Sequence, residues 1–170
     1  MKTIKIILGI ISTFIIVFFA TGLIIKETNY TTQVSVNKQI SDVFAAFNNL
    51  ENKTIWIPEI KSYKIINQNT GMTGSEYQMV IKNKDQNITI SERIMAFIPN
   101  EKVTIFYNVN NMLKTNDYFF TEKNGVTNIT LKASCRSGSY ILACVFPYFK
   151  STFKEQDQKY LTNFKAFIEQ

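Results

Sequence analysis

The feature of this chain that most limits its fold is an apolar run from Ile6 to Ile25, which contains no charged residue. A helix of about twenty residues spans roughly 30 Å, the thickness of the hydrocarbon core of a bilayer. Apolar side chains cover every side of this run, so it lacks the polar stripe of a core helix in a soluble protein. We therefore expect residues 1–27 to be a transmembrane segment and residues 28–170 to form one folded domain.

A cleaved signal peptide is the alternative interpretation of the run. Ala20 and Gly22 fit the small-residue positions of a cleavage site, but the run exceeds the apolar stretch of roughly 7–15 residues that is typical of signal peptides. Apolar residues also continue after the cleavage point, at 23–25. We favour an uncleaved signal anchor. Lys2 and Lys5 place more positive charge before the span than follows it, which favours a cytoplasmic N-terminus and a domain outside the cytoplasm.

Composition excludes several classes of function. The chain has 19 Lys and Arg against 13 Asp and Glu, and without Lys2 and Lys5 the net charge of the folded part is about +4. This charge is scattered, so nucleic acid is not an expected partner. The chain contains no histidine, which excludes histidine-based catalysis and histidine-ligated metal ions. We expect no cofactor and no metal site.

The two cysteines, Cys135 and Cys144, are too few for a four-thiolate metal site. Outside the cytoplasm they can form a disulfide, or they can remain small buried hydrophobic residues. A catalytic thiol is disfavoured because the chain offers no histidine partner.

Alternation of apolar and polar residues predicts a sheet. Thr31–Val36 is the first predicted strand, and the Asn124-Gly125 pair favours a tight hairpin before the last one. Polar turns, including residues 84–87, separate the others. These strands are Ile60–Gln68, Ser75–Lys82, Asn87–Ile98, Lys102–Val109, Lys114–Thr121 and Val126–Cys135.

Two short helices are predicted between the first two strands. The first follows a cap at Asn37 or Ser41, and the second covers Leu50–Trp56. Pro58 ends the second helix, because the residue before a proline avoids helical backbone angles.

A long amphipathic helix is predicted over Ile141–Glu169, with Pro147 in its first turn. Aromatic residues recur along one face at helical spacing. They are Phe146, Phe149, Phe153, Tyr160, Phe164 and Phe167. Gln156 and Asp157 interrupt this stripe. They either orient the polar group of a ligand or lie on the exposed side of the helix.

The order of elements indicates an α+β domain, in which an antiparallel sheet buries one face against the long C-terminal helix. The stretch from Val34 to Phe44, followed by Trp56-Ile57-Pro58, resembles the opening of the START-like helix-grip superfamily (SRPBCC). That group includes polyketide cyclase/dehydrase and lipid-transport proteins. Further features that fit it are Gly71 to Gly74, Glu92 with Pro99, and Gly125 to Thr127.

The resemblance covers residues 31–168, and most members of the superfamily lack a membrane anchor. It implies a curved antiparallel sheet of six to seven strands wrapped around the C-terminal helix. It also implies a mainly apolar pocket between sheet and helix, which binds lipids, sterols, polyketides or other hydrophobic molecules.

The candidates for the lining of such a pocket are aromatic residues and a few polar ones. Each also has a plainer interpretation, a packed core for the aromatic residues and an exposed surface for the polar ones. Strand faces alternate, so Arg93 and Glu92 cannot both point inward, and an outward Arg93 is favoured. The candidates are Trp56, Tyr77, Arg93, Tyr107, Tyr118, Phe149, Phe153, Asp157, Tyr160 and Phe164.

Two functions of different class stay open. The first is membrane-tethered binding of a hydrophobic small molecule or lipid by a monomer, with the membrane as its other partner. The second is a polyketide cyclase/dehydrase-like reaction on a bound hydrophobic substrate, for which we assign no catalytic residue. A protein-interaction domain is a third possibility. The missing histidine disfavours the enzyme, so we favour the binding protein.

Overall fold

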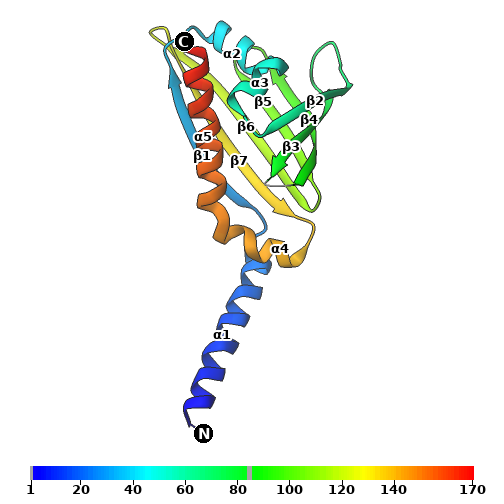
Figure 1. Cartoon of the computed structure of the whole chain (residues 1–170). Helices are drawn as coiled ribbons and strands as arrows, with labels where there is room; N and C mark the ends of the chain where they lie inside the picture. The colour runs from blue at the N-terminus through cyan, green and yellow to red at the C-terminus, as the bar shows by residue number, and fades with distance from the viewer. Residues whose placement is uncertain (1, 84–85) are drawn as a thin grey trace.

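Seven strands, each antiparallel to its neighbours, form one curved sheet in the residues that the computed structural model describes, 2–83 and 86–170. The strand order is β1-β7-β6-β5-β4-β3-β2, and the sheet curls around helix α5 (Figure 1). The strands are β1 (Thr28–Val36), β2 (Ile60–Asn67), β3 (Glu76–Asn83), β4 (Gln86–Ile98), β5 (Lys102–Val109), β6 (Met112–Lys123) and β7 (Val126–Ser137). The helices are α1 (Lys2–Ile24), α2 (Ile40–Asn48), α3 (Leu50–Trp56), α4 (Tyr140–Val145), the 3₁₀ helix η1 (Phe146–Phe149) and α5 (Lys150–Ile168).

Side-chain alternation decides which strand residues face α5. In β7 every second residue from Thr127 to Cys135 is buried, as the sequence pattern predicts. The hairpin before it uses the predicted turn, with φ of 55° at Asn124 and 75° at Gly125. Of the turn that we predicted at 84–87, residues 84 and 85 lie outside the described residues.

The two short helices close one end of the sheet with an aromatic core. The Phe47 ring of α2 lies 5.3 Å from Trp56 of α3, 4.8 Å from Tyr118 of β6 and 5.3 Å from Phe164 of α5, measured between ring centroids. Trp56 is 2% exposed and joins the short helices to α5. This end of the fold is therefore filled by aromatic rings.

The start of α2 differs from the prediction. Neither Asn37 nor Ser41 caps it, since the residue before the helix is Gln39, which makes no side-chain cap. Instead the backbone N–H of Ile40 donates to a carboxylate oxygen of Glu122 at 2.8 Å. A residue of β6, far away in the sequence, thus holds the helix start.

The predicted long C-terminal helix is split in three. Pro147 has no backbone N–H, so the α-helical ladder is interrupted and residues 146–149 form the 3₁₀ turn η1. Of these three helices α5 covers the sheet, whereas α4 packs mainly against α1. The split also divides the aromatic stripe, because Phe164 is fully buried whereas Phe149 is 49% exposed.

Helix α1 extends away from the domain (Figure 1). By length and composition it can cross a membrane, and nearly all of its side chains are exposed. Three residues, 25–27, connect it to β1. The Ser134 hydroxyl of β7 donates to the Glu27 carboxylate at 2.9 Å, which ties this short link to the sheet.

Candidate binding site on the concave face of the sheet

A row of polar side chains crosses the concave face, the side of the sheet that faces α5. Directly paired residues of antiparallel strands lie on the same face, so the register places their side chains next to each other. Tyr77 pairs with Glu92, Glu92 with Tyr107, Tyr107 with Lys114, and Lys114 with Cys135. We call these five residues the polar row.

Helix α3 supplies a cation for Glu92. The Lys53 Nζ lies 2.7 Å from Glu92 Oε1, and the side chains are 6% and 1% exposed. The same ammonium group donates to the Tyr63 hydroxyl at 3.3 Å and lies 5.3 Å from the centroid of that ring. Two charges leave water at high cost unless they are paired and hydrogen-bonded. Here the positive charge of Lys53 and the negative charge of Glu92 compensate each other.

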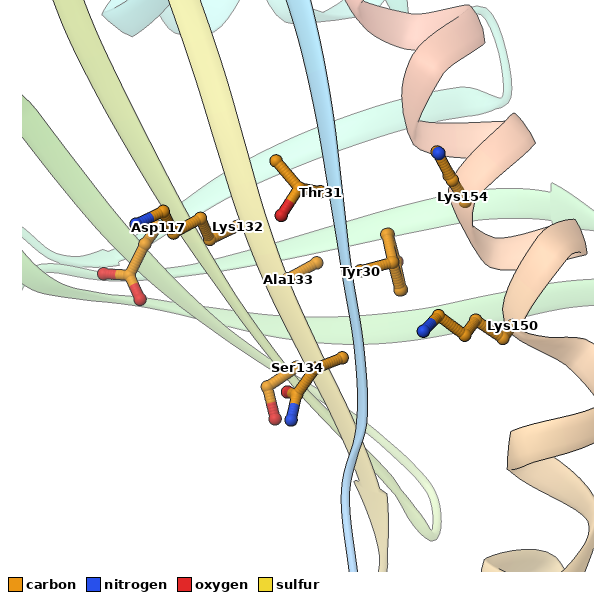
Figure 2. Close-up of a pocket in the computed structure, with 9 residues that line it drawn as sticks. Tyr30, Thr31, Asp117, Lys132, Ala133, Ser134, Lys150 and Lys154 are labelled. Carbon is orange, nitrogen blue, oxygen red and sulfur yellow. The ribbon is translucent and has the colours of Figure 1, made fainter. Parts of the chain in front are cut away.

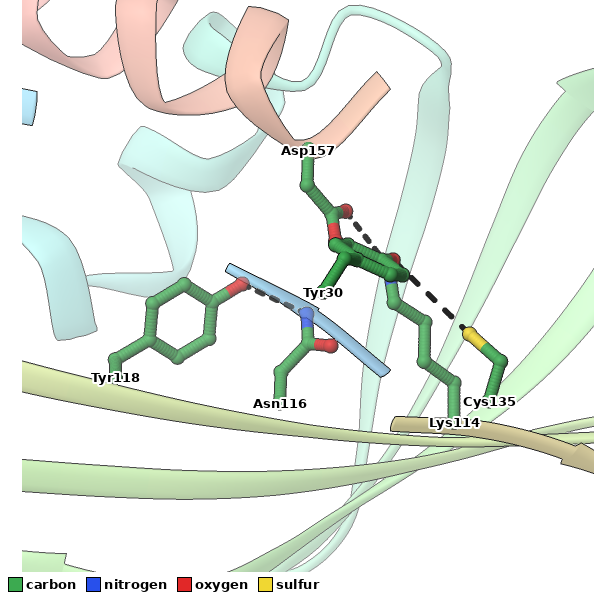
Figure 3. A network of polar contacts seen from close by, with 6 residues as sticks. All are labelled: Tyr30, Lys114, Asn116, Tyr118, Cys135 and Asp157. Atoms are coloured by element: carbon green, nitrogen blue, oxygen red, sulfur yellow. Dashed lines mark hydrogen bonds and ion pairs between the residues drawn. The ribbon is translucent and has the colours of Figure 1, made fainter. Parts of the chain in front are cut away.

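Helix α5 supplies an anion for Lys114. The two carboxylate oxygens of Asp157 accept hydrogen bonds from Lys114 Nζ at 2.6 and 2.8 Å (Figure 3). The Tyr30 hydroxyl donates to the same carboxylate at 2.8 Å and lies 4.0 Å from the Cys135 sulfur. Asp157 is 3% exposed. The interruption of the aromatic stripe therefore marks a buried ion pair that joins α5 to the sheet.

Tyrosine hydroxyls surround both ion pairs and remain protonated. Loss of solvent is the main cause of their raised pKa, and the Glu92 and Asp157 carboxylates raise it further. The tyrosines with a pKa raised in this way are Tyr30, Tyr63, Tyr107 and Tyr118. Burial also raises the pKa of the Cys135 thiol. These groups are hydrogen-bond donors at neutral pH rather than acids that release a proton.

Some buried polar atoms near the polar row have no hydrogen-bond partner among the described residues. They include Tyr77 Oη and Asn116 Oδ1, on side chains that are each 2% exposed. The Asn116 amide nitrogen, in contrast, donates to the Tyr118 hydroxyl at 3.0 Å (Figure 3). A buried group without a partner costs about 1–3 kcal/mol. A bound molecule with a complementary polar group would remove that cost.

The predicted pocket residues fall in several places. On the concave face, in or beside the polar row, lie Tyr77, Tyr107 and Tyr118, and Asp157 contacts the row from α5. Trp56 and Phe164 belong to the aromatic core, with ring centroids 5.5 Å apart. Phe153 and Tyr160 are half-buried on α5.

Arg93 and Phe149 lie outside this region. Because Glu92 faces inward, the Arg93 side chain faces outward, where it is 56% exposed and pairs with Glu76. Phe149 lies on η1 beside α1, since the break at Pro147 turns η1 away from the sheet.

Sequence reasoning missed several residues of the site. Lys114, Asn116 and Tyr118 are spaced two residues apart along β6 and therefore lie on one face, so this spacing could have identified Lys114 and Asn116 as inward-facing residues. Lys53 lies three residues before Trp56 and therefore on the same side of α3, but a lysine is by default assigned to solvent. Tyr30 precedes the predicted start of its strand.

A separate pocket of about 590 Å³ lies along the edge strand β1 (Figure 2). Lys150 of α5 extends toward Tyr30 there, Lys154 lines the pocket from further along α5, and Lys132 and Asp117 line its other side. This pocket is basic and open to solvent, unlike the apolar pocket expected between sheet and helix.

No protein-family model matches the chain, and no curated protein matches it in sequence. Solved structures do match its fold. Ara h 8.0201 has a TM-score of 0.67 at 11% identity, over 84% of this chain and 97% of that one. TTHA0849 from Thermus thermophilus has a TM-score of 0.66 at 10% identity, over 82% and 96%. The Zhui aromatase/cyclase from Streptomyces sp. R1128 has a TM-score of 0.69 at 9% identity, over 84% and 94%.

Identities this low establish the fold and leave the activity open. The seven-stranded curved sheet with its C-terminal helix confirms the fold expected from the sequence. The chain has the helix-grip fold.

Proposed function

We propose that the chain is a membrane-tethered START-like protein that binds a hydrophobic small molecule or lipid between the sheet and α5. The observation that carries this proposal is the presence on the concave face of two buried atoms, Tyr77 Oη and Asn116 Oδ1, that have no hydrogen-bond partner within residues 2–83 and 86–170. The fold supports it as well, because a sheet curled around one helix brings a large inner surface to a single site.

The chemistry of these atoms defines the polar group of the ligand. Tyr77 on β3 offers a hydroxyl donor and Asn116 on β6 an amide oxygen acceptor, and each can bind a hydroxyl or an amide of the ligand. The Lys53–Glu92 and Lys114–Asp157 pairs already balance their own charges, so a neutral head group fits better than a charged one.

Aliphatic side chains offer the apolar part of the site. They lie on the same strands as the polar row, two residues away along each strand and therefore on the same face. These residues are Met79, Ile90, Ile94 and Ile105. The proposed ligand is thus mainly hydrophobic with neutral polar groups.

The membrane tether gives this activity a physical reason. Hydrophobic molecules partition into bilayers, and α1 would hold the domain at high effective concentration next to them. The positive charge of Lys2 and Lys5 favours a cytoplasmic N-terminus, which leaves the domain outside the cytoplasm. We propose that the protein acts there as a monomer.

Binding is favoured over a cyclase-like reaction. The Glu92 and Asp157 carboxylates are each paired with a lysine, and the surrounding tyrosines have a raised pKa. Proton transfer needs a group whose pKa lies near the working pH. These residues instead suit hydrogen bonding to a bound molecule.

The test is mass spectrometry of small molecules that co-purify with the full chain in lipid nanodiscs. We expect a hydrophobic molecule at near-stoichiometric amount, and Tyr77→Phe should weaken its retention by roughly 5- to 30-fold, the equivalent of one hydrogen bond. Tyr148→Phe is the matched control, because Tyr148 lies on η1 and is 59% exposed. Both variants should stay folded.

Two results would contradict the proposal. One is a folded chain that carries no specific molecule beyond those found in empty nanodiscs. The other is equal retention of the molecule by the Tyr77→Phe and Tyr148→Phe variants, which would remove Tyr77 from the site.

A further inference from the structure

The segment from Tyr140 to Phe149, which comprises α4 and η1, is fastened to the end of α1. The Tyr140 hydroxyl donates to the Phe19 carbonyl oxygen at 2.6 Å, and the Tyr148 and Thr21 hydroxyls lie 3.1 Å apart. The Tyr140 ring stacks on Phe19, with centroids 6.1 Å apart. These contacts hold the segment beside the last two turns of α1.

Gly22 permits this close approach. It is the buried residue of α1, and a Cβ atom at this position would lie only 2.4 Å from the Cys144 sulfur. A larger residue would have to displace the Cys144 side chain and would crowd the Cys144 backbone nitrogen, 3.2 Å from that Cβ, so it would loosen the packing of α4 on α1. The glycine and the two tyrosines together fix the segment at one height along the apolar helix.

The other side of the segment exposes hydrophobic side chains. Ile141 is 62% exposed, Leu142 36% and Phe149 49%. An apolar groove of about 780 Å³ runs between the segment and α1, and it is lined by Phe14, Phe18, Val145 and Phe149 among others. A contiguous apolar surface of this kind marks an interaction site.

The position of this surface identifies its partner. It is continuous with the exposed apolar side chains of α1, so whatever surrounds α1 also surrounds the segment. Tyrosine is enriched where a membrane meets water, the level at which an apolar span ends. Exposed Lys26, Arg136 and Lys150 lie in the chain next to α1, α4 and η1, where they suit anionic lipid head groups.

We propose that Tyr140–Phe149 is a second membrane contact, which inserts Ile141, Leu142 and Phe149 into the interfacial region of the bilayer that α1 spans. This inference rests on the membrane tether of the proposed function. Lipid acyl chains fill the groove between the segment and α1. The domain is then held to the bilayer at two places, so the end of the sheet next to α4 faces the membrane.

The test measures the depth of tryptophan probes in the full chain, reconstituted in vesicles of phosphatidylcholine and phosphatidylglycerol. The phosphatidylcholine carries bromine either near the head group or near the chain end, and bromine quenches tryptophan on contact. Trp56, the native tryptophan, is 2% exposed on α3 at the far end of the domain, and it gives a constant background (Figure 1). The probe is Ile141→Trp.

We expect the shallow bromine to quench Ile141→Trp more than the deep bromine does, with a blue-shifted emission in both lipids. Phe14→Trp, near the middle of α1, reports the span itself and should be quenched most by the deep bromine. Ile65→Trp is the matched exposed control on β2, where the native residue is 50% exposed, and it should show no quenching.

The outcomes separate the two proposals. Quenching of Phe14→Trp without quenching of Ile141→Trp overturns the second contact and leaves the tether intact. Blue-shifted Ile141→Trp emission without quenching also overturns it, because a protein partner or a second copy then covers the segment. If Phe14→Trp is not quenched either, the tether is wrong and the second contact fails with it.

Discussion

Two neighbouring charged residues, Glu92 and Arg93, have opposite surroundings because strand side chains alternate. Glu92 is 2% exposed and depends on Lys53 for its counter-charge, whereas the Arg93–Glu76 pair lies at the surface. A buried charge that loses its partner keeps its full cost of desolvation, and an exposed charge does not. The two ion pairs should therefore differ strongly in their effect on stability.

We expect Lys53→Met to lower the free energy of unfolding by about 3–5 kcal/mol, because it leaves the Glu92 carboxylate buried and unpaired. Arg93→Met is the matched surface variant and should change the free energy by less than about 1 kcal/mol. Denaturant unfolding in detergent, followed by circular dichroism, measures both. The double variant Lys53→Met, Glu92→Leu should recover most of the loss, and equal effects of the two single variants would refute the assignment.

At the scale of elements, the packing of α4 on α1 depends on one glycine. We expect Gly22→Val to separate the two helices, because a Cβ atom at this position would lie 2.4 Å from the Cys144 sulfur. Cys144, which is buried against α1, should then react faster with maleimide. Gly9→Val is the matched control, since no atom lies within 4 Å of a Cβ at that position of α1.

Mass spectrometry of the labelled peptides distinguishes the two cysteines, which are both free and buried in the described part of the chain. Cys135 serves as the internal reference, because it is buried on the concave face of the sheet and should stay unreactive in both variants. Equal Cys144 labelling in the Gly9→Val and Gly22→Val variants would show that α4 does not depend on Gly22.

Elements with a local signal were predictable from the sequence. The helix Leu50–Trp56 has the predicted bounds, and strand β7 has the predicted inner face. The C-terminal helix was predicted too long, because its aromatic spacing continues across Pro147. The partner that draws α4 away is α1, more than a hundred residues earlier, and no local pattern reports such a contact.

The residues of the candidate site were likewise predictable only where the sequence carries a local signal. Tyr118 lies in a strand whose burial alternates every second residue, Tyr107 lies in a predicted strand, and Asp157 interrupts a helical stripe, so each could be selected from the sequence. Lys53 and Lys114 could not, because a buried lysine is recognised only with its carboxylate, and both pairs join different elements. The register that aligns the polar row is a property of the folded sheet.

At the scale of the whole molecule, the buried tyrosines predict a limit of stability at alkaline pH. The pKa of Tyr30, Tyr63, Tyr107 and Tyr118 is raised above the ordinary value of 10.0 in the folded state. The unfolded chain releases these protons from about pH 10, while the folded chain keeps them. The contribution is therefore complete below pH 10 and is lost as the pH rises further, by about 1.4 kcal/mol per pH unit for each tyrosine.

We expect the midpoint of thermal unfolding to fall gently from about pH 9, where the unfolded chain releases the Cys135 proton that the folded chain keeps, and to fall steeply above about pH 10. Tyrosinate absorbance should rise together with unfolding rather than before it. Tyr107→Phe should make the fall less steep, whereas Tyr148→Phe, at an exposed position, should not. Ionisation of the buried tyrosines at pH 10 in a chain that remains folded would contradict the burial described for them.

The link of three residues between α1 and β1 also limits where the domain can work. Fully extended, it reaches about 10 Å, so a domain anchored by α1 cannot travel to a second membrane with its cargo. Such a protein acts at one membrane and does not carry molecules between two membranes. Any molecule that it accepts must arrive in, and leave through, its own bilayer or a carrier that docks beside it.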